Sequence, residues 1–194
     1  WLARERFTPF ADALKRLHRP AEPADLQPEG PAWSRLAYDE FLAGQLALAL
    51  LRAHQRSLPG RGSSSEGRLR ARVIAALPYS LTPSQQRAVG EIVADLARPH
   101  RMVRLLQGDV GSGKTVVALL AAATVIEAGR QAALMAPTEI LARQHLATIA
   151  PLAEAAGLRV AILTGRERGR ERDETLERLA LGDIDLLVGT HALF

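Results

Sequence analysis

Residues 108–115 read Gly-Asp-Val-Gly-Ser-Gly-Lys-Thr, and they fit the spacing G-x-x-x-x-G-K-[ST] without a mismatch. In this pattern a glycine-rich turn lets backbone N–H groups converge on phosphate oxygens, and the following helix directs its positive end toward them. Lys114 would reach the β- and γ-phosphates, and the Thr115 hydroxyl would ligate Mg²⁺. The stretch therefore predicts a loop that binds a nucleoside triphosphate with Mg²⁺.

The flanks of this loop support the same interpretation. The apolar run before it, 102–106 (Met-Val-Arg-Leu-Leu), predicts a buried strand, and residues 116–127 after it predict a helix that ends near Gly129. A chance glycine turn between a strand and a helix is the alternative. The order of strand, loop and helix favours the phosphate-binding loop.

From residue 68 onward the hydrophobic pattern alternates between helices and strands. It predicts helices over 68–77, 83–96, 139–156 and 170–181, and strands over 132–135, 160–163 and 184–188. Thr82 and Pro83 suit the cap and the first position of a helix, and Pro151 should bend or break the helix that contains it. Strands that alternate with helices indicate an α/β fold with a parallel sheet covered on both faces.

The first 67 residues have a different character. Several prolines and a short helical stretch in residues 1–30 indicate the tail of an upstream domain and a linker. Residues 31–57 carry apolar side chains at helical spacing, and Pro31 suits a first helical turn. Residues 58–67 are rich in Gly and Ser and predict a flexible loop.

The composition fits a folded protein with a basic balance. Apolar residues make up 47% of the chain, so a sizeable core can form. The formal net charge is +4, and most basic residues are arginine. The planar guanidinium of arginine suits phosphates, so nucleic acid is a plausible partner, but biased genomic composition would also produce an excess of arginine. The absence of Cys fits a cytoplasmic location, and the apolar runs are too short to span a membrane. Because the chain begins with Trp1 rather than Met, we expect a piece of a longer protein.

Short polar segments follow the predicted strands, at the ends where parallel sheets bind ligands. They are 108–115, 136–139, 164–165 and 189–191. The Thr138 hydroxyl could contact a phosphate backbone, or it could cap the following helix, whose positive end Glu139 also favours. His191 could contact phosphate or be an ordinary rim histidine. Gln85 could pair with a purine edge through its amide or be a surface glutamine.

Two further groups of residues permit more than one interpretation. Arg166, Arg168, Arg170 and Arg172 are interleaved with acidic residues and predict a solvated face, with a nucleic-acid contact as the second interpretation. Tyr38 and Phe41 predict core positions in the helix over 31–57 rather than base-stacking groups.

Taken in order along the chain, the motifs resemble those of superfamily 2 helicases. Residues 81–85 (Leu-Thr-Pro-Ser-Gln) resemble the adenine-sensing glutamine motif, and residues 108–115 resemble motif I. Residues 136–139 (Ala-Pro-Thr-Glu) resemble motif Ia, residues 164–165 (Thr-Gly) the element that follows it, and residues 189–191 (Gly-Thr-His) the element before motif II.

The resemblance narrows to the RecG-type ATP-dependent DNA helicases. The residues most similar to that family are 104–118, 135–141 and 188–194. The first part of the chain is similar as well: residues 13–20 resemble the end of the family's wedge domain, and residues 35–48 resemble its connecting helix. The transcription-repair coupling factor is the alternative, but its loop usually carries an aromatic residue where this chain has Ser112. A non-helicase P-loop nucleotide-binding switch is a further alternative, and its base-reading segment is missing from the sequence.

The resemblance implies a fold, a reaction and a role for each motif. The fold would be a P-loop RecA-like parallel sheet flanked by helices, in an ATP-dependent double-stranded DNA translocase or helicase that remodels stalled forks and Holliday junctions in recombination and repair. Gln85 would recognise adenine, Lys114 and Thr115 would be catalytic, and Thr115 would ligate Mg²⁺. ATP would be held by Gly108, Asp109, Val110, Gly111, Ser112, Gly113, Lys114 and Thr115, and the DNA track would include Thr138, Glu139, Thr164, Gly165, Thr190 and His191.

The same resemblance implies the domain organisation and the setting. Residues 1–30 would end the wedge domain and its linker, 31–57 would form the connecting helix, 58–67 a loop, and 68–194 the first part of the ATP-binding motor domain. The partner would be branched double-stranded DNA, bound by a cytoplasmic, nucleoid-associated monomer with no membrane contact. The sequence stops at Phe194, before the expected Asp-Glu-x-His motif, so we expect this chain alone to hydrolyse little ATP.

Overall fold

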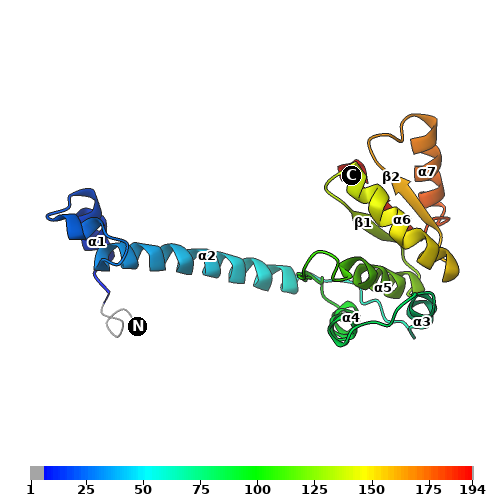
Figure 1. Cartoon of the computed structure of the whole chain (residues 1–194), viewed down its shortest axis with the longest axis horizontal. Helices are drawn as coiled ribbons and strands as arrows, with labels where there is room; N and C mark the ends of the chain where they lie inside the picture. Colours follow the sequence, from blue (N-terminus) through cyan, green and yellow to red (C-terminus); the bar gives the residue numbers. More distant parts are fainter. Residues whose placement is uncertain (1–6, 194) are drawn as a thin grey trace. The chain divides into compact units, whose positions relative to one another are not determined.

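The computed structural model describes residues 7–193, which form two compact units that divide between Leu58 and Pro59 (Figure 1). The first unit contains α1 (Phe10–His18), the 3-10 helix η1 (Pro23–Leu26) and α2 (Pro31–Ser57). The second contains α3 (Arg68–Ala75), α4 (Pro83–Leu96), α5 (Lys114–Glu127), β1 (Ala132–Met135), α6 (Glu139–Ala155), β2 (Val160–Leu163), α7 (Arg170–Ala180), β3 (Leu186–Gly189) and the 3-10 helix η2 (His191–Leu193).

The first unit is helical, and α1 packs against the beginning of α2. Ala13 and Ala32 are buried there, and α2 has the bounds that the apolar spacing predicts. Tyr38 and Phe41 are 40% and 76% exposed, so the prediction that they are core residues is wrong for this unit. The reason is length, because the 9 residues of α1 cannot cover the 27 residues of α2. Tyr38 contacts the Phe7 ring instead, with centroids 4.9 Å apart.

The second unit is built on a parallel three-stranded sheet in the order β1-β3-β2. β1 and β2 have the predicted bounds, and β3 lies slightly later than predicted. Met135 of β1 and Leu163 of β2 are both in register with Gly189 of β3. The segments that follow these three strands therefore emerge at one edge of the sheet, as expected for parallel strands.

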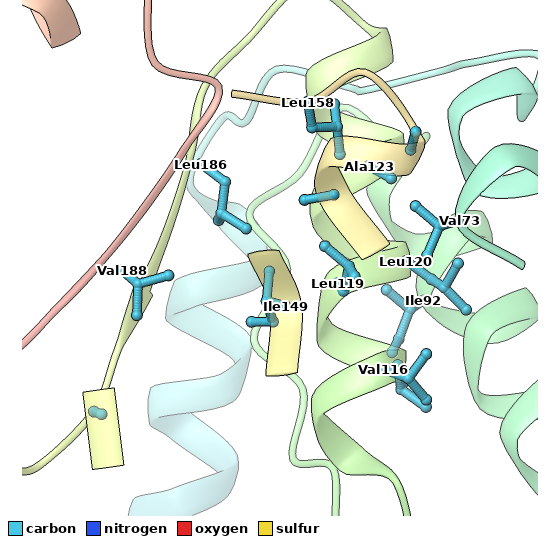
Figure 2. Packing of buried hydrophobic residues seen from close by; sticks show 14 of the residues in the cluster. Val73, Ile92, Val116, Leu119, Leu120, Ala123, Ile149, Leu158, Leu186 and Val188 are labelled. Atoms are coloured by element: carbon cyan, nitrogen blue, oxygen red, sulfur yellow. The ribbon is translucent and has the colours of Figure 1, made fainter. Parts of the chain in front are cut away.

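Side chains of β3 alternate between two apolar layers. Leu186 and Val188 belong to the larger cluster, which α3, α4, α5 and α6 also build (Figure 2). Leu187 belongs to a second cluster on the other face, together with Leu163 and Ile184. The central strand β3 is therefore buried on both faces, as a continuous apolar strand requires. Ala133 and Met135 of the edge strand β1 are exposed, so the predicted cover on both faces does not extend over that strand.

One predicted strand is not formed. Residues 102–106 run without a ladder partner among the described residues, and Val103 and Leu105 are 75% and 84% exposed. A strand needs a neighbour to pair its backbone groups, and β1 to β3 pair with one another and not with this segment. Arg104 holds the segment beside α4 through Glu91 (2.7 Å) and Asp95 (Nε to Oδ2, 3.0 Å).

Two other features of the second unit bear on the predictions. Pro151 does not break α6, which continues to Ala155 with Ile149 and Ala153 buried on either side of it. Residues 58–67 form no helix, yet the Ser63 N–H donates to the Leu96 carbonyl at 2.7 Å and Arg130 donates to the Arg61 carbonyl at 2.7 Å. These contacts hold a segment that composition alone predicts to be flexible.

No helix between residues 7 and 193 combines the length and apolar content needed to cross a membrane.

Candidate functional site

The loop at 108–115 turns through two glycines in the left-handed region. Gly111 has φ +80° and Gly113 has φ +81°, a conformation that costs a residue with a Cβ about 1–2 kcal/mol. The Ser112 N–H closes the turn by donating to the Asp109 carbonyl at 3.2 Å. Gly113 is also the N-cap of α5 and offers no side-chain cap. The first turn of α5 therefore keeps backbone donors that suit an anion.

The Lys114 ammonium lies across this loop. Its Nζ donates to the Gly108 and Asp109 carbonyls, each at 2.7 Å. A Cβ on Gly108 would lie 2.7 Å from the Ser112 Oγ, so a larger residue there would require this hydroxyl to move. A concave backbone, an ammonium and a helix N-terminus are thus brought together, and this donor set fits a triphosphate.

Gln85 connects α4 to the loop. Its amide oxygen accepts from the Thr82 N–H at 2.9 Å, and the Thr82 hydroxyl accepts from the Gln85 N–H at 3.2 Å, which forms a capping box at the start of α4. Its amide Nε2 donates to the Ser112 carbonyl at 2.9 Å. Since an amide offers two N–H donors and two acceptor lone pairs, one of each is left for a purine edge.

A cavity of about 590 Å³ is lined by residues that precede and follow Gln85 in the sequence. Tyr79, whose ring is 52% exposed, and Gln86 belong to its wall. The complete lining is Ile74, Leu77, Pro78, Tyr79, Ser80, Leu81 and Gln86. An aromatic ring and apolar side chains suit the face of a planar base.

Thr115 is the second residue of α5. Its hydroxyl lies 3.4 Å from His145 Nδ1 of α6, within a partly buried contact. His145 was not predicted to be a site residue from the sequence, although the helical spacing of α6 indicates that it has a partner. It falls between Ala142 and Ile149 on the buried face of α6, and a polar side chain on an apolar face often has a specific partner.

The other predicted residues lie where the three strands end. Thr138 caps α6 by accepting from the Leu141 N–H at 3.3 Å, so the capping interpretation is confirmed for its hydroxyl. Thr190 is partly buried and its hydroxyl accepts from the Ala192 N–H at 3.5 Å, while His191 is exposed in η2. Gly165 is exposed immediately after β2. Thr138, Gly165 and His191 therefore share the carboxyl edge of the sheet.

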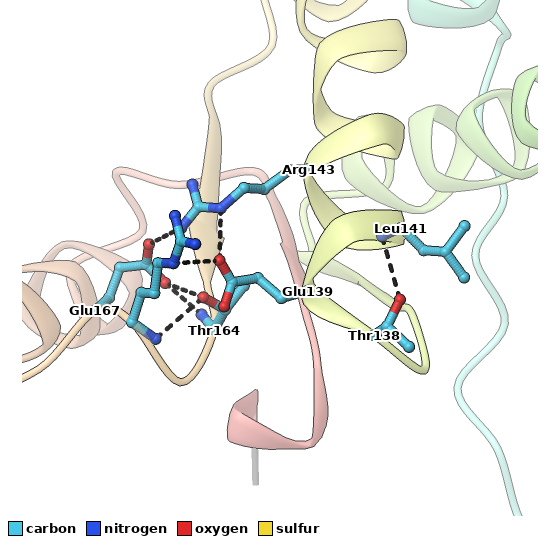
Figure 3. A network of polar contacts seen from close by, with 7 residues as sticks. Thr138, Glu139, Leu141, Arg143, Thr164 and Glu167 are labelled. Carbon is cyan, nitrogen blue, oxygen red and sulfur yellow. Dashed lines mark hydrogen bonds and ion pairs between the residues drawn. The ribbon is translucent and has the colours of Figure 1, made fainter.

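Thr164 and Glu139 are engaged with other residues. The Thr164 side chain is 0% exposed, and its hydroxyl donates to Glu167 at 2.6 Å. Glu139 accepts from Arg143 at 3.0 Å and pairs with Arg166 at 2.8 Å (Figure 3). Both side chains therefore support the rim, and their contact with DNA stays a prediction.

Glu167 was predicted to lie on a solvated face, but it is only 7% exposed. Burial acts to raise the pKa of its carboxyl group, but hydrogen bonds from the Thr164 hydroxyl, the Thr164 N–H and Arg143 outweigh burial and lower the pKa to about 2. Its ionised carboxylate thereby joins the turn after β2 to α6 (Figure 3). One feature of the sequence indicates this contact, because Glu167 lies only three residues after Thr164, at the end of the predicted strand.

The match to a known family covers most of this arrangement. Residues 82–194 match the DEAD/DEAH box helicase family, and they include Gln85, the loop at 108–115 and the sheet edge. The chain belongs to this helicase family. The helicase fold, a RecA-like parallel sheet flanked by helices, is thus confirmed.

Individual relatives of this helicase chain are RecG proteins. It is 46% identical over 185 residues to the ATP-dependent DNA helicase RecG of Bacillus subtilis, covering 95% of this chain and 27% of that protein. It is 42% identical over 187 residues to RecG of Escherichia coli K12, covering 94% of this chain and 27% of that protein. A solved structure of RecG bound to a three-way DNA junction superposes with a TM-score of 0.77 at 39% identity, over 98% of this chain and 26% of that one.

These matches confirm the resemblance to RecG-type helicases. They extend over both units, including the helices upstream of the loop. The chain spans about a quarter of the length of these relatives.

Proposed function

We propose that this chain binds ATP with Mg²⁺ and forms part of an ATP-dependent translocase or helicase that acts on branched double-stranded DNA. The observation that carries the proposal is the loop at 108–115. Its left-handed glycines, the Lys114 ammonium and the start of α5 converge as a phosphate site requires. The RecG relatives, which are named ATP-dependent DNA helicases, support the same reaction.

In this proposal the residues of the site have separate tasks. Lys114 exchanges the Gly108 and Asp109 carbonyls for phosphate oxygens, and the loop N–H groups hold the remaining oxygens. The Thr115 hydroxyl holds Mg²⁺, and Gln85 uses its remaining amide groups for adenine. When bound, ATP supplies the phosphoanhydride bond whose cleavage drives movement along DNA.

The sheet edge supplies the proposed DNA contacts. Thr138, Gly165, Thr190 and His191 follow strands that end in register, so they form one row at the carboxyl edge of the sheet. Backbone N–H groups and short polar side chains position a phosphate backbone without reading its sequence. A related RecG structure holds a three-way junction, which supports stalled forks and Holliday junctions as the substrates.

The surrounding organisation is part of the same proposal. Residues 1–30 would complete a wedge domain, 31–57 would connect it to the motor, and 68–194 would begin the ATP-binding domain. We further propose that the full-length protein works as a monomer in the cytoplasm, in association with the nucleoid.

Replacement of the loop lysine tests this function. In the full-length protein, Lys114→Ala should abolish DNA-stimulated ATP hydrolysis and leave DNA affinity measurable, because a phosphate-binding charge is lost while the sheet edge stays intact. Lys15→Ala, which removes the other lysine of this chain at an exposed position, is the matched control and should hydrolyse ATP normally. Unchanged turnover in Lys114→Ala would overturn the assignment.

A further inference from the structure

The Arg166 side chain lies at the carboxyl edge of the sheet, directly after the Thr164-Gly165 turn. Its Nε pairs with the Glu139 carboxylate at 2.8 Å, and its side chain is 74% exposed. Glu139 is the first residue of α6 and follows β1, so this ion pair joins the ends of two strands that flank β3. Arg166 thus stands in the same row as Thr138 and Gly165.

The ion pairs around Glu139 have very different surroundings. Arg143 donates to Glu139 at 3.0 Å and to Glu167 at 2.8 Å, and the Glu167 side chain is only 8% exposed. Glu167 is the buried member of its pair with Arg143, whose side chain is 39% exposed. Loss of the guanidinium would leave the charge of a buried carboxylate without this partner, so the Arg143–Glu167 contact resists exchange. The Arg166–Glu139 contact is open to solvent and contributes little to stability, so it exchanges easily.

We propose that Arg166 contacts a phosphate of the DNA backbone and that Glu139 is its exchangeable counter-ion. The proposal rests on the proposed DNA-binding function of this sheet edge. A guanidinium carries five N–H donors in a planar fork that matches phosphate oxygens, and most of the Arg166 side chain faces solvent. When a phosphate takes the place of Glu139, that carboxylate keeps its bond to Arg143 and is not left without a cationic partner.

Arg143 and Glu167 act as positioning residues in this arrangement. Glu167 accepts from the Thr164 N–H at 2.6 Å, which fixes the turn that carries Arg166. Arg143 joins that turn to α6. The buried contacts therefore hold the exposed guanidinium at the edge.

The first test measures how DNA affinity depends on salt. In the full-length protein, Arg166→Gln should weaken binding to a three-way junction roughly threefold to tenfold, and should lower the slope of log K against log[salt] by about one. The matched control is Arg170→Gln, because Arg170 is a 92% exposed arginine of the same cluster that pairs with Glu174 along α7. The control should keep the slope of the wild type. An unchanged slope in Arg166→Gln, or an equal fall in both variants, would overturn the proposal.

The second test separates counter-ion exchange from a purely structural role of Glu139. Glu139→Gln should tighten DNA binding, because the amide competes less well than a carboxylate for Arg166. The gain should disappear when Arg166→Gln is also present, since the two changes act on one contact. A loss of affinity in Glu139→Gln, or a gain that persists in the double variant, would contradict the exchange. Thermal unfolding of each variant identifies effects that come from misfolding.

The outcomes distinguish this inference from the proposed function. If the wild-type protein binds junctions and Lys114→Ala lacks ATPase while Arg166→Gln binds normally, only the role of Arg166 fails. If the wild-type protein binds no junction at any salt concentration, the proposed function itself fails.

Discussion

The Gln85 amide donates to the Ser112 carbonyl at 2.9 Å and accepts from the Thr82 N–H at the same distance. One side chain thereby fixes the start of α4 and the bend of the phosphate loop. The contact is tight, because a Cβ on Gly113 would lie 2.3 Å from the Gln85 Nε2. Recognition of a base by the remaining groups of this amide would therefore also affect the shape of the loop that holds the phosphates.

Gln85→Ala should raise the KM for ATP about tenfold in the full-length protein, with a smaller change in kcat. The alanine removes the base contact and the support of the loop, a loss of about 1.4 kcal/mol in binding. Steady-state kinetics with ATP and GTP measure this, and the variant should discriminate less between the two bases. Gln144→Ala changes an exposed glutamine of α6 and is the control. Wild-type kinetics in Gln85→Ala would refute the role of the amide.

Thr164→Val should lower the free energy of unfolding by about 1–3 kcal/mol, since the buried Glu167 loses a hydroxyl donor that valine cannot replace. Thr148→Val removes an exposed hydroxyl that donates to the Gln144 carbonyl, and it should cost much less. Chemical unfolding of both variants measures the difference. A Thr164→Val protein of normal stability that has lost DNA binding would instead favour direct contact between Thr164 and DNA.

The low pKa of Glu167 predicts a specific dependence of stability on pH. The carboxyl group has a pKa of about 2 in the folded chain against its usual 4.5, so it stabilises the fold above pH 4.5. This contribution, of the order of 3 kcal/mol, is lost as the pH falls from 4.5 toward 2, because the unfolded chain then binds a proton more readily. Glu167→Gln should therefore be less stable at pH 7 and show a flatter fall in this interval. Parallel pH profiles for the two proteins would argue against the assignment.

Most of the fold follows from local patterns in the sequence. Helix periodicity and the caps at Thr82 and Thr138 define α4 and α6, and the glycine pattern defines the loop before α5. Whether residues 102–106 form a strand could not be predicted from those residues alone. Apolar residues such as Leu105 permit a strand, but pairing depends on a neighbour elsewhere in the chain.

The parts of the site whose backbone geometry is encoded by a motif could be predicted from the sequence. The parts whose burial and partners depend on tertiary contacts were harder to predict. The bends at Gly111 and Gly113 follow from the motif itself. The burial of Glu167 does not, because a run of alternating charges looks the same whether a carboxylate faces water or a buried threonine. His145 also needs the fold, since its partner Thr115 is 30 residues away in the sequence.

The larger apolar cluster should dominate the stability of the second unit. Leu120 of α5 is 0% exposed, and Leu120→Ala should lower the free energy of unfolding by about 2–5 kcal/mol because it removes apolar contacts and leaves a cavity (Figure 2). Leu181→Ala, at a residue that is 70% exposed, should change it by less than about 0.5 kcal/mol. Denaturant unfolding compares the two, and equal effects would mean that the cluster is not the core of this unit.

The contact between Thr115 and His145 predicts a change in Mg²⁺ dependence. A hydroxyl oxygen that gives a lone pair to Mg²⁺ still has a hydrogen to donate, and the His145 Nδ1 at 3.4 Å accepts it in the tautomer that carries its proton on Nε2. His145→Leu removes the acceptor, so the Mg²⁺ concentration for half-maximal ATPase should rise roughly tenfold or more. His145→Asn keeps an oxygen acceptor near the same position and should recover part of the loss. Mg²⁺ titrations at saturating ATP measure both variants, and nucleotide binding without Mg²⁺ should be unchanged in each. If His145→Leu needs no more Mg²⁺ than the wild type, the histidine does not orient the Thr115 hydroxyl.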